Sequence, residues 1–294
     1  MRLLNRPHAL RAAIAGFLAG VALSISMPAS AGLLGGLVER AVERQVTKHV
    51  GERFSQPNAA PVSLPPAGSF AGCQQLFPQG AVIDVAKVDR QWRPTALCSS
   101  HFAVLYSGLS KTPLVVVERL NREQMAQALD EARTNEFYAD PRLPAGSRAE
   151  LDDFRGSGLD RGHLAPAGDQ PDQASMAQSF ALSNMVPQDP FNNRKTWAKI
   201  ESDVRKFVRR AQGNVYVFSG PIFRGQQRTI GRSQVWVPSH LFKLVYDEAS
   251  GRSWAYILAN TAEARVEAPM DYASFVQQTG WRVLPGAVMA AAAR

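Results

Sequence analysis

One stretch of the chain, from Asn192 to Ala211, has the clearest helical alternation of hydrophobic and polar positions. Its apolar residues recur three and four positions apart, which places them on one face of an α-helix. They are Trp197, Ile200, Val204, Phe207 and Val208. Basic residues gather in the last turns, where the negative end of the helix dipole favours them. The pattern predicts an amphipathic helix that packs one face on a core.

Short β-branched and aromatic runs elsewhere are typical of strands. Residues 102–106 and 113–118 flank a turn that contains Ser and Gly, which predicts a hairpin. Further strands are expected at 159–164, 180–185, 215–220, 235–237, 241–246 and 254–258, and helices at 122–133 and, briefly, 150–154. Helices and strands do not alternate as βαβ units. The expected fold class is therefore α+β, with a central, mainly antiparallel sheet and flanking helices.

The first 31 residues have the pattern of a signal peptide. Three arginines precede an apolar run from Ala12 to Ile25, and Ala29-Ser30-Ala31 forms a small-residue cleavage site. The run is too short to cross a bilayer comfortably, and no later stretch is long and apolar enough to do so. We expect cleavage after Ala31 and a soluble protein, periplasmic or secreted, that has no membrane association after cleavage.

Two segments follow before the main folded domain, which we expect over residues 70–294. Residues 32–54 have an amphipathic helical pattern, and residues 56–68 are rich in Pro, Ala and Ser, as linkers are. Residues 32–69 are thus expected to be a helix and a Pro-rich linker. A solvated helix is favoured over an oligomerisation element, and whether the protein is a homodimer stays open.

The chain is basic, with a formal net charge of +8 and a sequence pI near 9.8. Loss of residues 1–31 removes three arginines and no acids, so the charge falls to +5. This balance favours polyanionic partners such as nucleic acid, anionic lipid or polyphosphate, and it says nothing about fold.

Cys73 and Cys98 are the only cysteines. In an exported protein such a pair favours a disulfide. A metal pair or a reactive thiol is disfavoured, because the chain has no other cysteine.

His163 is the first candidate for chemistry, because Asp160, Arg161 and Gly162 precede it directly. A neutral imidazole can take a proton from water near physiological pH. Asp160 either orients the site through hydrogen bonds or caps local backbone. Arg161 either contacts phosphate or pairs with Asp160, and Gly162 is expected to let a substrate approach the backbone.

Asn193 and Glu201 form the second candidate group. An Asn at a helix start is commonly an N-cap, but Mg²⁺ keeps several waters and needs few protein ligands. Glu201 lies eight residues on, rotated by about 80° around a helix, where its carboxylate can reach metal-bound waters. The alternative for Glu201 is a helix ion pair with Lys199 or Arg205. A zinc site is disfavoured, because the sequence has no HExxH motif and no Cys/His cluster.

Taken together, these motifs resemble the DNA/RNA non-specific endonuclease family, the ββα-metal nucleases, and the resemblance runs from about Cys73 to Leu284. The matching motifs are Arg133-x-x-x-Phe137-x-x-Asp140, Asp160-Arg161-Gly162-His163, Ser183-Asn184-x-x-Pro187-Gln188, Asn193-x-x-x-Trp197-x-x-x-Glu201, Ser219 to Phe223 and Val237 to Lys243. The resemblance implies that residues 70–294 form a nuclease domain with a ββα-metal active-site module.

The resemblance also implies a role for each matching residue. His163 matches the general base, Asn193 the one direct protein ligand of Mg²⁺, and Glu201 the acid that holds metal-bound waters. Arg133 matches the arginine that stabilises phosphate charge, and Arg161 adds positive charge there. Mn²⁺ is a possible substitute for Mg²⁺. Asn192 competes with Asn193, and Arg133 has three competitors: Arg142, Arg148 and Arg155.

The expected function is an exported, Mg²⁺-dependent endonuclease that hydrolyses DNA and RNA to 5′-phosphate and 3′-hydroxyl ends. A basic nucleic-acid-binding protein with a vestigial nuclease site is the alternative. A toxin paired with an immunity protein keeps the chemistry and changes the biology. The sequence leaves open the preference between DNA and RNA, and it identifies no protein inhibitor.

Overall fold

The computed structural model describes residues 67–128 and 134–286. The predicted signal peptide (1–31) lies outside the described residues, as do residues 32–66 of the predicted helix and linker. The last five residues of the helix predicted at 122–133 are also outside them, and Arg133 is one of these. The cleavage site, the domain boundary near residue 70 and the placement of Arg133 therefore stay predictions.

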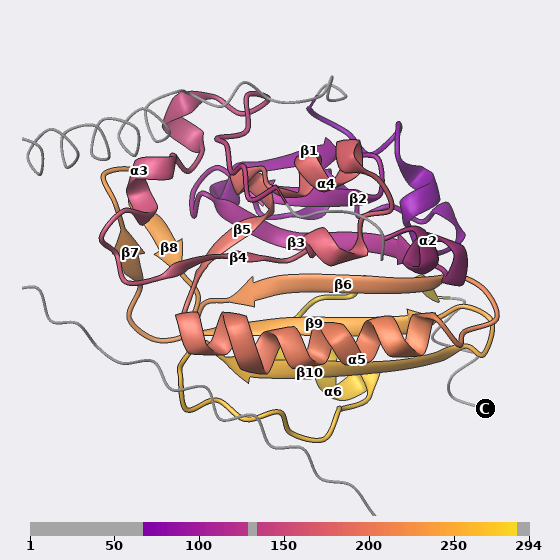
Figure 1. The fold of residues 1–294 in the computed structure, drawn as a ribbon. Helices are drawn as coiled ribbons and strands as arrows, with labels where there is room; N and C mark the ends of the chain where they lie inside the picture. Colours follow the sequence, from indigo (N-terminus) through magenta and orange to yellow (C-terminus); the bar gives the residue numbers. More distant parts are fainter. Residues whose placement is uncertain (1–66, 129–133, 287–294) are drawn as a thin grey trace, which may run out of the picture. The chain divides into compact units, whose positions relative to one another are not determined.

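Six antiparallel strands form one sheet in the order β1-β2-β3-β6-β9-β10 (Figure 1). They are β1 (Pro94–Cys98), β2 (Phe102–Ser107), β3 (Thr112–Leu120), β6 (Val215–Ile222), β9 (His240–Asp247) and β10 (Arg252–Ala259). The predicted hairpin is confirmed as β2 and β3. The central strands carry long apolar runs because both faces of the sheet are covered.

Each face of the sheet has its own hydrophobic core, because alternate side chains of a strand point to opposite faces. On one face, α5 (Ala198–Val208) buries Ile200, Val204 and Val208 against the strands. On the other face lies α6 (Tyr272–Thr279), with Phe275 fully buried. Cys73 and Cys98 belong to the α6-side core and form the predicted disulfide, with their Cα atoms 5.8 Å apart.

In the described residues, two short ribbons complete the β-structure: β4 (Asp160–His163) with β5 (Met185–Gln188), and β7 (Arg228–Ile230) with β8 (Val235–Val237). The other α-helices in this part of the chain are α2 (Arg122–Gln127), α3 (Leu151–Phe154) and α4 (Gln173–Ser179). A π-helical turn, η8 (Asn192–Trp197), leads into α5. Short 3₁₀ turns are η1 (Gln74–Leu76), η2 (Pro78–Gly80), η3 (Val85–Lys87), η4 (Arg90–Trp92), η5 (Ala145–Ser147), η6 (Ala167–Asp169) and η7 (Leu182–Asn184).

The strand predicted at 180–185 is wrong. Phe180 ends α4, residues 182–184 form η7, and β5 begins only at Met185. The Asn184 side chain donates to the carbonyls of Ala165 and Ser179, and its oxygen accepts from the Ala165 amide. These bonds hold the segment in a turn. A short apolar run marks burial, and it cannot by itself distinguish a strand from a buried turn.

The predicted fold class is confirmed: the protein is α+β, with a large antiparallel sheet between helices (Figure 1). Among the helices of the described residues, none is long and apolar enough to cross a bilayer.

Candidate active site

The β4–β5 ribbon carries the Asp-Arg-Gly-His motif. His163 lies opposite Met185 and Gly162 opposite Val186 in the register of the two strands. A Cβ atom at Gly162 would overlap the Gln188 side chain. The expectation that Gly162 admits substrate is therefore wrong, because Gln188 fills that space. The glycine instead allows the two strands of the site to pack closely.

The imidazole of His163 is buried, with 7% of the residue exposed. Its ring lies edge-on to Phe180, with centroids 5.0 Å apart, and tilted against Phe137 at 5.6 Å. The Arg161 guanidinium covers the same Phe137 ring, with its central carbon 4.2 Å from the ring centroid. Burial lowers the pKa of Arg161 and the charge of Asp160 raises it, but a guanidinium stays charged in either case. A cation and an imidazole thus share one aromatic side chain.

The helix of Asn193 has its cap at Asp189. The Asp189 carboxylate accepts from the Asn192 amide at 2.9 Å, and Pro190 follows it at the first helical position. Asn192 is fully buried, accepts from Gln188 Nε2 at 2.7 Å and donates to the Ala259 carbonyl at 2.6 Å. Asn192 is therefore occupied within the fold. Asn193, which is only partly buried, is the better-placed ligand of the two.

Asn193 Nδ2 donates to Asp160 Oδ2 at 2.9 Å. A carboxylate only accepts hydrogen bonds, so the atom that faces it must be the amide nitrogen. The Asn193 oxygen, which has the lone pairs a metal needs, is then directed away from Asp160. This contact supports the orienting role of Asp160 over local backbone capping. The capping alternative for Asn193 also fails, because Asp189 already caps this helix.

Arg194, rather than Arg161, is the ion-pair partner of Asp160. Its Nε and Nη2 atoms donate to the two carboxylate oxygens at 2.8 and 2.7 Å. Burial raises the pKa of Asp160, but the hydrogen bonds from Arg194 and Asn193 and the charges of Arg194 and Arg161 outweigh it and hold that pKa below its usual value. Asp160 is therefore a carboxylate at neutral pH. The sequence reasoning missed Arg194, which adjoins Asn193.

Glu201 lies in the first turn of α5 and is partly buried. Its two expected ion-pair partners have other carboxylates: Lys199 pairs with Asp203 at 2.6 Å, and Arg205 with Asp169 at 2.9 Å. Burial lowers the pKa of Arg205, whereas the negative charges of Asp169 and Glu201 raise it, with a net increase. Glu201 thus adds negative charge near Arg205 and Glu118, on the helix that continues from the turn of Asn193.

The donor set fits a hard cation that keeps its waters. In the described part of the chain, no group of three or more His, Cys, Asp or Glu side chains is arranged to hold a metal. The Asn193 oxygen, together with waters and substrate phosphate, could hold a metal here. Asp160 supplies negative charge beside Asn193. Mg²⁺ is bound in this manner, through few protein ligands, whereas structural zinc needs four nitrogen or sulfur ligands.

Arg133, the predicted phosphate-binding arginine, lies outside the described residues. Its three competitors all have partners. Arg142 is buried and forms a two-pronged pair with Asp140, while Arg148 pairs with Glu150 and exposed Arg155 with Asp152. Arg142 is thereby committed to the fold.

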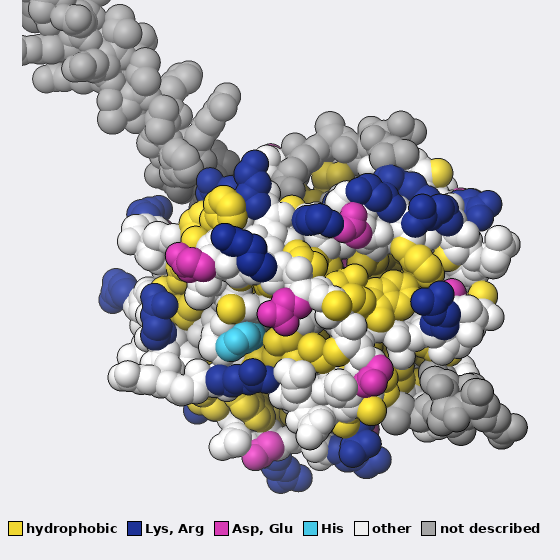
Figure 2. Space-filling view, turned by 90° about the horizontal axis from the view of Figure 1, so that it is seen from below, with side chains coloured by type: hydrophobic (Ala, Val, Ile, Leu, Met, Phe, Trp, Pro, Cys, Tyr) yellow, Lys and Arg dark blue, Asp and Glu magenta, His cyan; other side chains and the backbone are white. Residues whose placement is uncertain are grey.

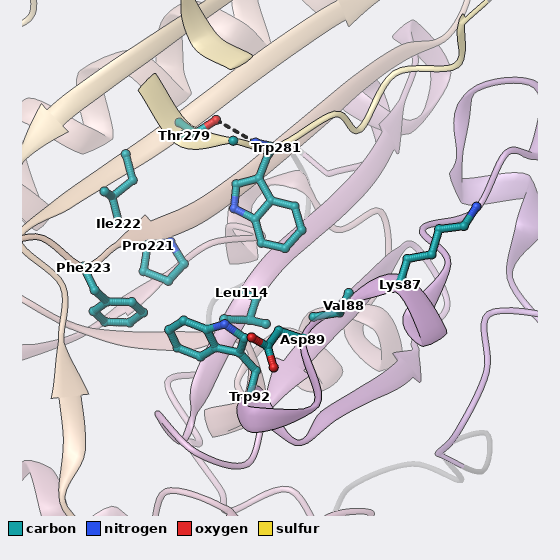
Figure 3. A pocket seen from close by; sticks show the side chains of 11 residues that line it. Lys87, Val88, Asp89, Trp92, Leu114, Pro221, Ile222, Phe223, Thr279 and Trp281 are labelled. Atoms are coloured by element: carbon teal, nitrogen blue, oxygen red, sulfur yellow. Dashed lines mark hydrogen bonds between the residues drawn. The ribbon is translucent and has the colours of Figure 1, made fainter. Parts of the chain in front are cut away.

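A cleft of about 530 Å³ adjoins the ribbon at Leu159 and Asp189, the residues that flank β4 and β5, and Arg224 and Asn260 also line it. An aromatic pocket of about 410 Å³ lies on the α6 side of the sheet, where Trp92 and Trp281 face its cavity (Figure 3). No predicted site residue in the described part lines the aromatic pocket.

Comparison with known proteins identifies relatives of the chain. The sequence model of the DNA/RNA non-specific endonuclease family matches residues 85–285. Human mitochondrial nuclease EXOG is 35% identical over 169 residues, which cover 54% of this chain and 45% of the relative. Human mitochondrial endonuclease G is 37% identical over 161 residues (51% and 54%). Nuclease C1 of Cunninghamella echinulata var. echinulata is 38% identical over 142 residues (44% and 56%).

A crystal structure of the EndoG/EndoGI complex is similar in fold, with a TM-score of 0.57 and 26% sequence identity. The similarity covers 63% of this chain and 83% of that one. The chain spans about half the length of the curated relatives it matches. The family match covers more than half of the chain and includes the β4–β5 ribbon, η8 and α5. The chain therefore belongs to the DNA/RNA non-specific endonuclease family.

Proposed function

We propose that the protein is an exported, Mg²⁺-dependent endonuclease that hydrolyses phosphodiester bonds in DNA and RNA. One observation carries the proposal. The Asn193 amide is turned by a carboxylate, Asp160, that lies three residues before His163 on the same strand. The Asn193 oxygen, which we propose as the metal ligand, and the His163 imidazole are therefore linked through the four residues of β4. The relatives named above are nucleases.

His163 takes a proton from water, and that water attacks phosphorus. The P–O bond to the 3′ oxygen breaks, and the leaving oxygen takes a proton from solvent, which yields 5′-phosphate and 3′-hydroxyl ends. When bound, Mg²⁺ supplies positive charge to the phosphate oxygens. Burial between Phe137 and Phe180 holds the imidazole in place. Asn193 would hold the metal through its oxygen, and Glu201 would accept hydrogen bonds from the waters around it.

Two arginines supply positive charge for the phosphate in this proposal. Arg161 lies over Phe137, whose ring also contacts His163. Arg133 is assigned this role by its motif, Arg133-x-x-x-Phe137-x-x-Asp140. Positive groups that await developing negative charge lower the barrier to phosphoryl transfer.

The net positive charge of the chain suits a polyanion. Lys and Arg side chains are spread around the face shown in Figure 2, with Asp and Glu among them and hydrophobic side chains near the centre. Phosphate contacts of this kind make affinity fall as salt rises, and they do not read sequence. Export rests on the N-terminal pattern of residues 1–31.

A cleavage assay tests the proposal. The mature protein is incubated with supercoiled plasmid and with RNA, in Mg²⁺, in Mn²⁺ and with EDTA. We expect cleavage of both nucleic acids that EDTA abolishes, and products that a ligase joins without prior phosphorylation. Inactivity with both metals, alongside retained binding, would support the alternative, a nucleic-acid-binding protein with a vestigial site.

A further inference from the structure

A buried polar cluster lies on the α5-facing side of the sheet. It consists of Glu118 of β3, Ser219 of β6 and Lys243 of β9, and each has at most 1% of its surface exposed. Ser219 and Lys243 are direct cross-strand partners, and Glu118 lies in the neighbouring row, opposite Val217. The positions around the cluster are apolar, among them Val116, Val217 and Val245. This cluster interrupts an otherwise hydrophobic face.

Lys243 contacts both halves of the candidate site. Its ammonium group donates to Ser219 Oγ at 2.7 Å and to the Leu164 carbonyl at 3.4 Å, and it lies 4.9 Å from the Trp197 ring centroid. Leu164 directly follows His163, and Trp197 is four residues after Asn193 on the same helical segment. One cation therefore touches the strand end of the proposed base and the turn of the proposed metal ligand.

Burying an ammonium group is unfavourable unless it is paired and hydrogen-bonded. Replacing a buried ion pair by apolar side chains of similar volume is often neutral or stabilising for the fold. Stability alone therefore does not account for a lysine at this position. Burial and the charge of Asp169 raise the pKa of Glu118, whereas the charge of Lys243 lowers it, and Gln170 donates to Glu118 at 3.4 Å. Ser219, the Leu164 carbonyl and the Trp197 ring are the contacts that keep Lys243 in place.

We propose that Lys243 is a positioning residue that fixes the strand of His163 relative to the helix of Asn193. The inference rests on the proposed function, because it assigns a purpose to the spacing of those two residues. Lys243 acts through Leu164 and Trp197 and has no contact with the reacting atoms in this scheme.

The test is Lys243→Met, which keeps most of the length of the side chain and removes its charge. We expect the melting temperature to fall, because Ser219 Oγ and the Leu164 carbonyl lose their buried donor. At a temperature where the variant is folded, we expect kcat to fall by about 10- to 100-fold, since small misplacements of catalytic groups have effects of that size, and KM to change by less than about twofold. Lys111→Met is the matched control. The Lys111 ammonium also donates to a backbone carbonyl, that of Ser233 at 2.5 Å, away from the site. The Lys111→Met variant should leave kcat and KM unchanged.

A second measurement does not depend on cleavage. By calorimetry, we expect Mn²⁺ to bind the Lys243→Met variant about tenfold more weakly than wild type. The reason is that the turn of Asn193 loses its contact with the Lys243 ammonium group. The double variant Glu118→Gln/Lys243→Met also removes the Glu118 carboxyl group and should show the same loss of Mn²⁺ affinity. Wild-type kcat and wild-type Mn²⁺ affinity in either folded variant would overturn the positioning role. Wild-type protein that binds Mn²⁺ and cleaves nothing would count against the proposed function, and the Mn²⁺ comparison would still decide the role of Lys243.

Discussion

The Asn193 side-chain amide donates a hydrogen bond to Asp160 at 2.9 Å. Its neighbour Asn192 forms hydrogen bonds inside the fold with Gln188 and the Ala259 carbonyl. Two adjacent, chemically identical side chains thus have different surroundings. One is held with its oxygen directed away from a carboxylate. The other has its oxygen and its nitrogen occupied.

This difference predicts opposite effects for the two alanine variants. Asn193→Ala should keep the wild-type melting temperature and lose at least about 100-fold in cleavage rate, because metal binding loses its protein ligand. Asn192→Ala should lower the unfolding free energy by about 2–4 kcal/mol, because Gln188 and the Ala259 carbonyl lose their buried partner. Urea titration and plasmid cleavage separate the two. A stable, fully active Asn193→Ala protein would remove Asn193 from the metal site.

Asp160→Ala should raise the Mg²⁺ concentration needed for half-maximal cleavage by about 10- to 100-fold, the usual effect of losing a group that orients a metal ligand. The Asn193 amide is then free to rotate. The matched variant is Arg194→Ala, which removes the ion pair and leaves the carboxylate in place for Asn193. Arg194 is exposed, so its loss should change the Mg²⁺ requirement by less than about threefold. Equal effects of the two variants would argue against orientation as the role of Asp160.

His163→Ala should lower the cleavage rate by at least about 100-fold, the low end for loss of a general base. Binding of a noncleavable oligonucleotide should stay within about twofold of wild type, because binding relies on phosphate contacts. His101→Ala is the control, since His101 lies near Asp172, outside the β4–β5 ribbon. Near-normal cleavage by His163→Ala would disprove its role as the base.

Asp140 and Arg142 predict a pH-dependent contribution to stability. Burial raises the pKa of Asp140, but hydrogen bonds and charge from Arg142, with a hydrogen bond from Ser183, lower it below its usual value. A carboxyl whose folded pKa is depressed contributes stability above its unfolded pKa of about 3.9, and that contribution is lost as the pH falls through the folded value.

Asp140→Asn should therefore lower the unfolding free energy at pH 7 by about 3–5 kcal/mol, as for a broken buried pair. The difference from wild type should shrink below about pH 4, in the range where the carboxyl is protonated. Asp203→Asn, in an exposed pair with Lys199, should cost less than about 1 kcal/mol. Urea titrations at pH 7 and pH 3 measure both. A difference that is constant with pH would contradict the assignment.

Removal of the Cys73–Cys98 disulfide should lower the unfolding free energy by roughly 3 kcal/mol, the chain-entropy value for a loop of this length. The bond lies in the α6-side core, on the face of the sheet opposite α5. The Cys73→Ala/Cys98→Ala variant should accordingly keep its kcat at temperatures where it is folded. An unchanged melting temperature would show that the crosslink does not constrain the unfolded chain.

Six of the strands could be predicted from their β-branched and aromatic runs, and the long helix from its side-chain period, whereas β1, β5 and β7 were not predicted. The pattern from Trp197 to Val208 repeats over several turns, and α5 is found there. The helices α4 and α6 were not predicted, because each is short and depends on a side-chain cap, Asp172 and Asp271 respectively. The strand expected at 180–185 failed because three-dimensional packing of Asn184 selects a turn.

The candidate site could be predicted in its residues but only partly in its contacts. The sequence singled out Asp160, His163 and Asn193, yet it offered no way to decide whether Asn193 capped its helix. That decision needed the position of Asp189. Arg194 and Lys243 were missed, since their roles depend on which strands become neighbours. The one signal that could have identified Lys243 is its charge at an inward-facing position of the strand predicted at 241–246.

Gln188 packs on Gly162 and also donates to Asn192, so a single side chain sets the gap between the strand of His163 and the start of the Asn193 helix. A change in the position of Gln188 therefore affects both the strand of His163 and the helix of Asn193. An added methyl group at residue 162 has to displace β5, and that displacement carries Asp189 and the helix start with it. Attempts to alter substrate preference by mutagenesis have little freedom at residues 162 and 188, and more at Arg161, whose side chain lies on the opposite face of the strand.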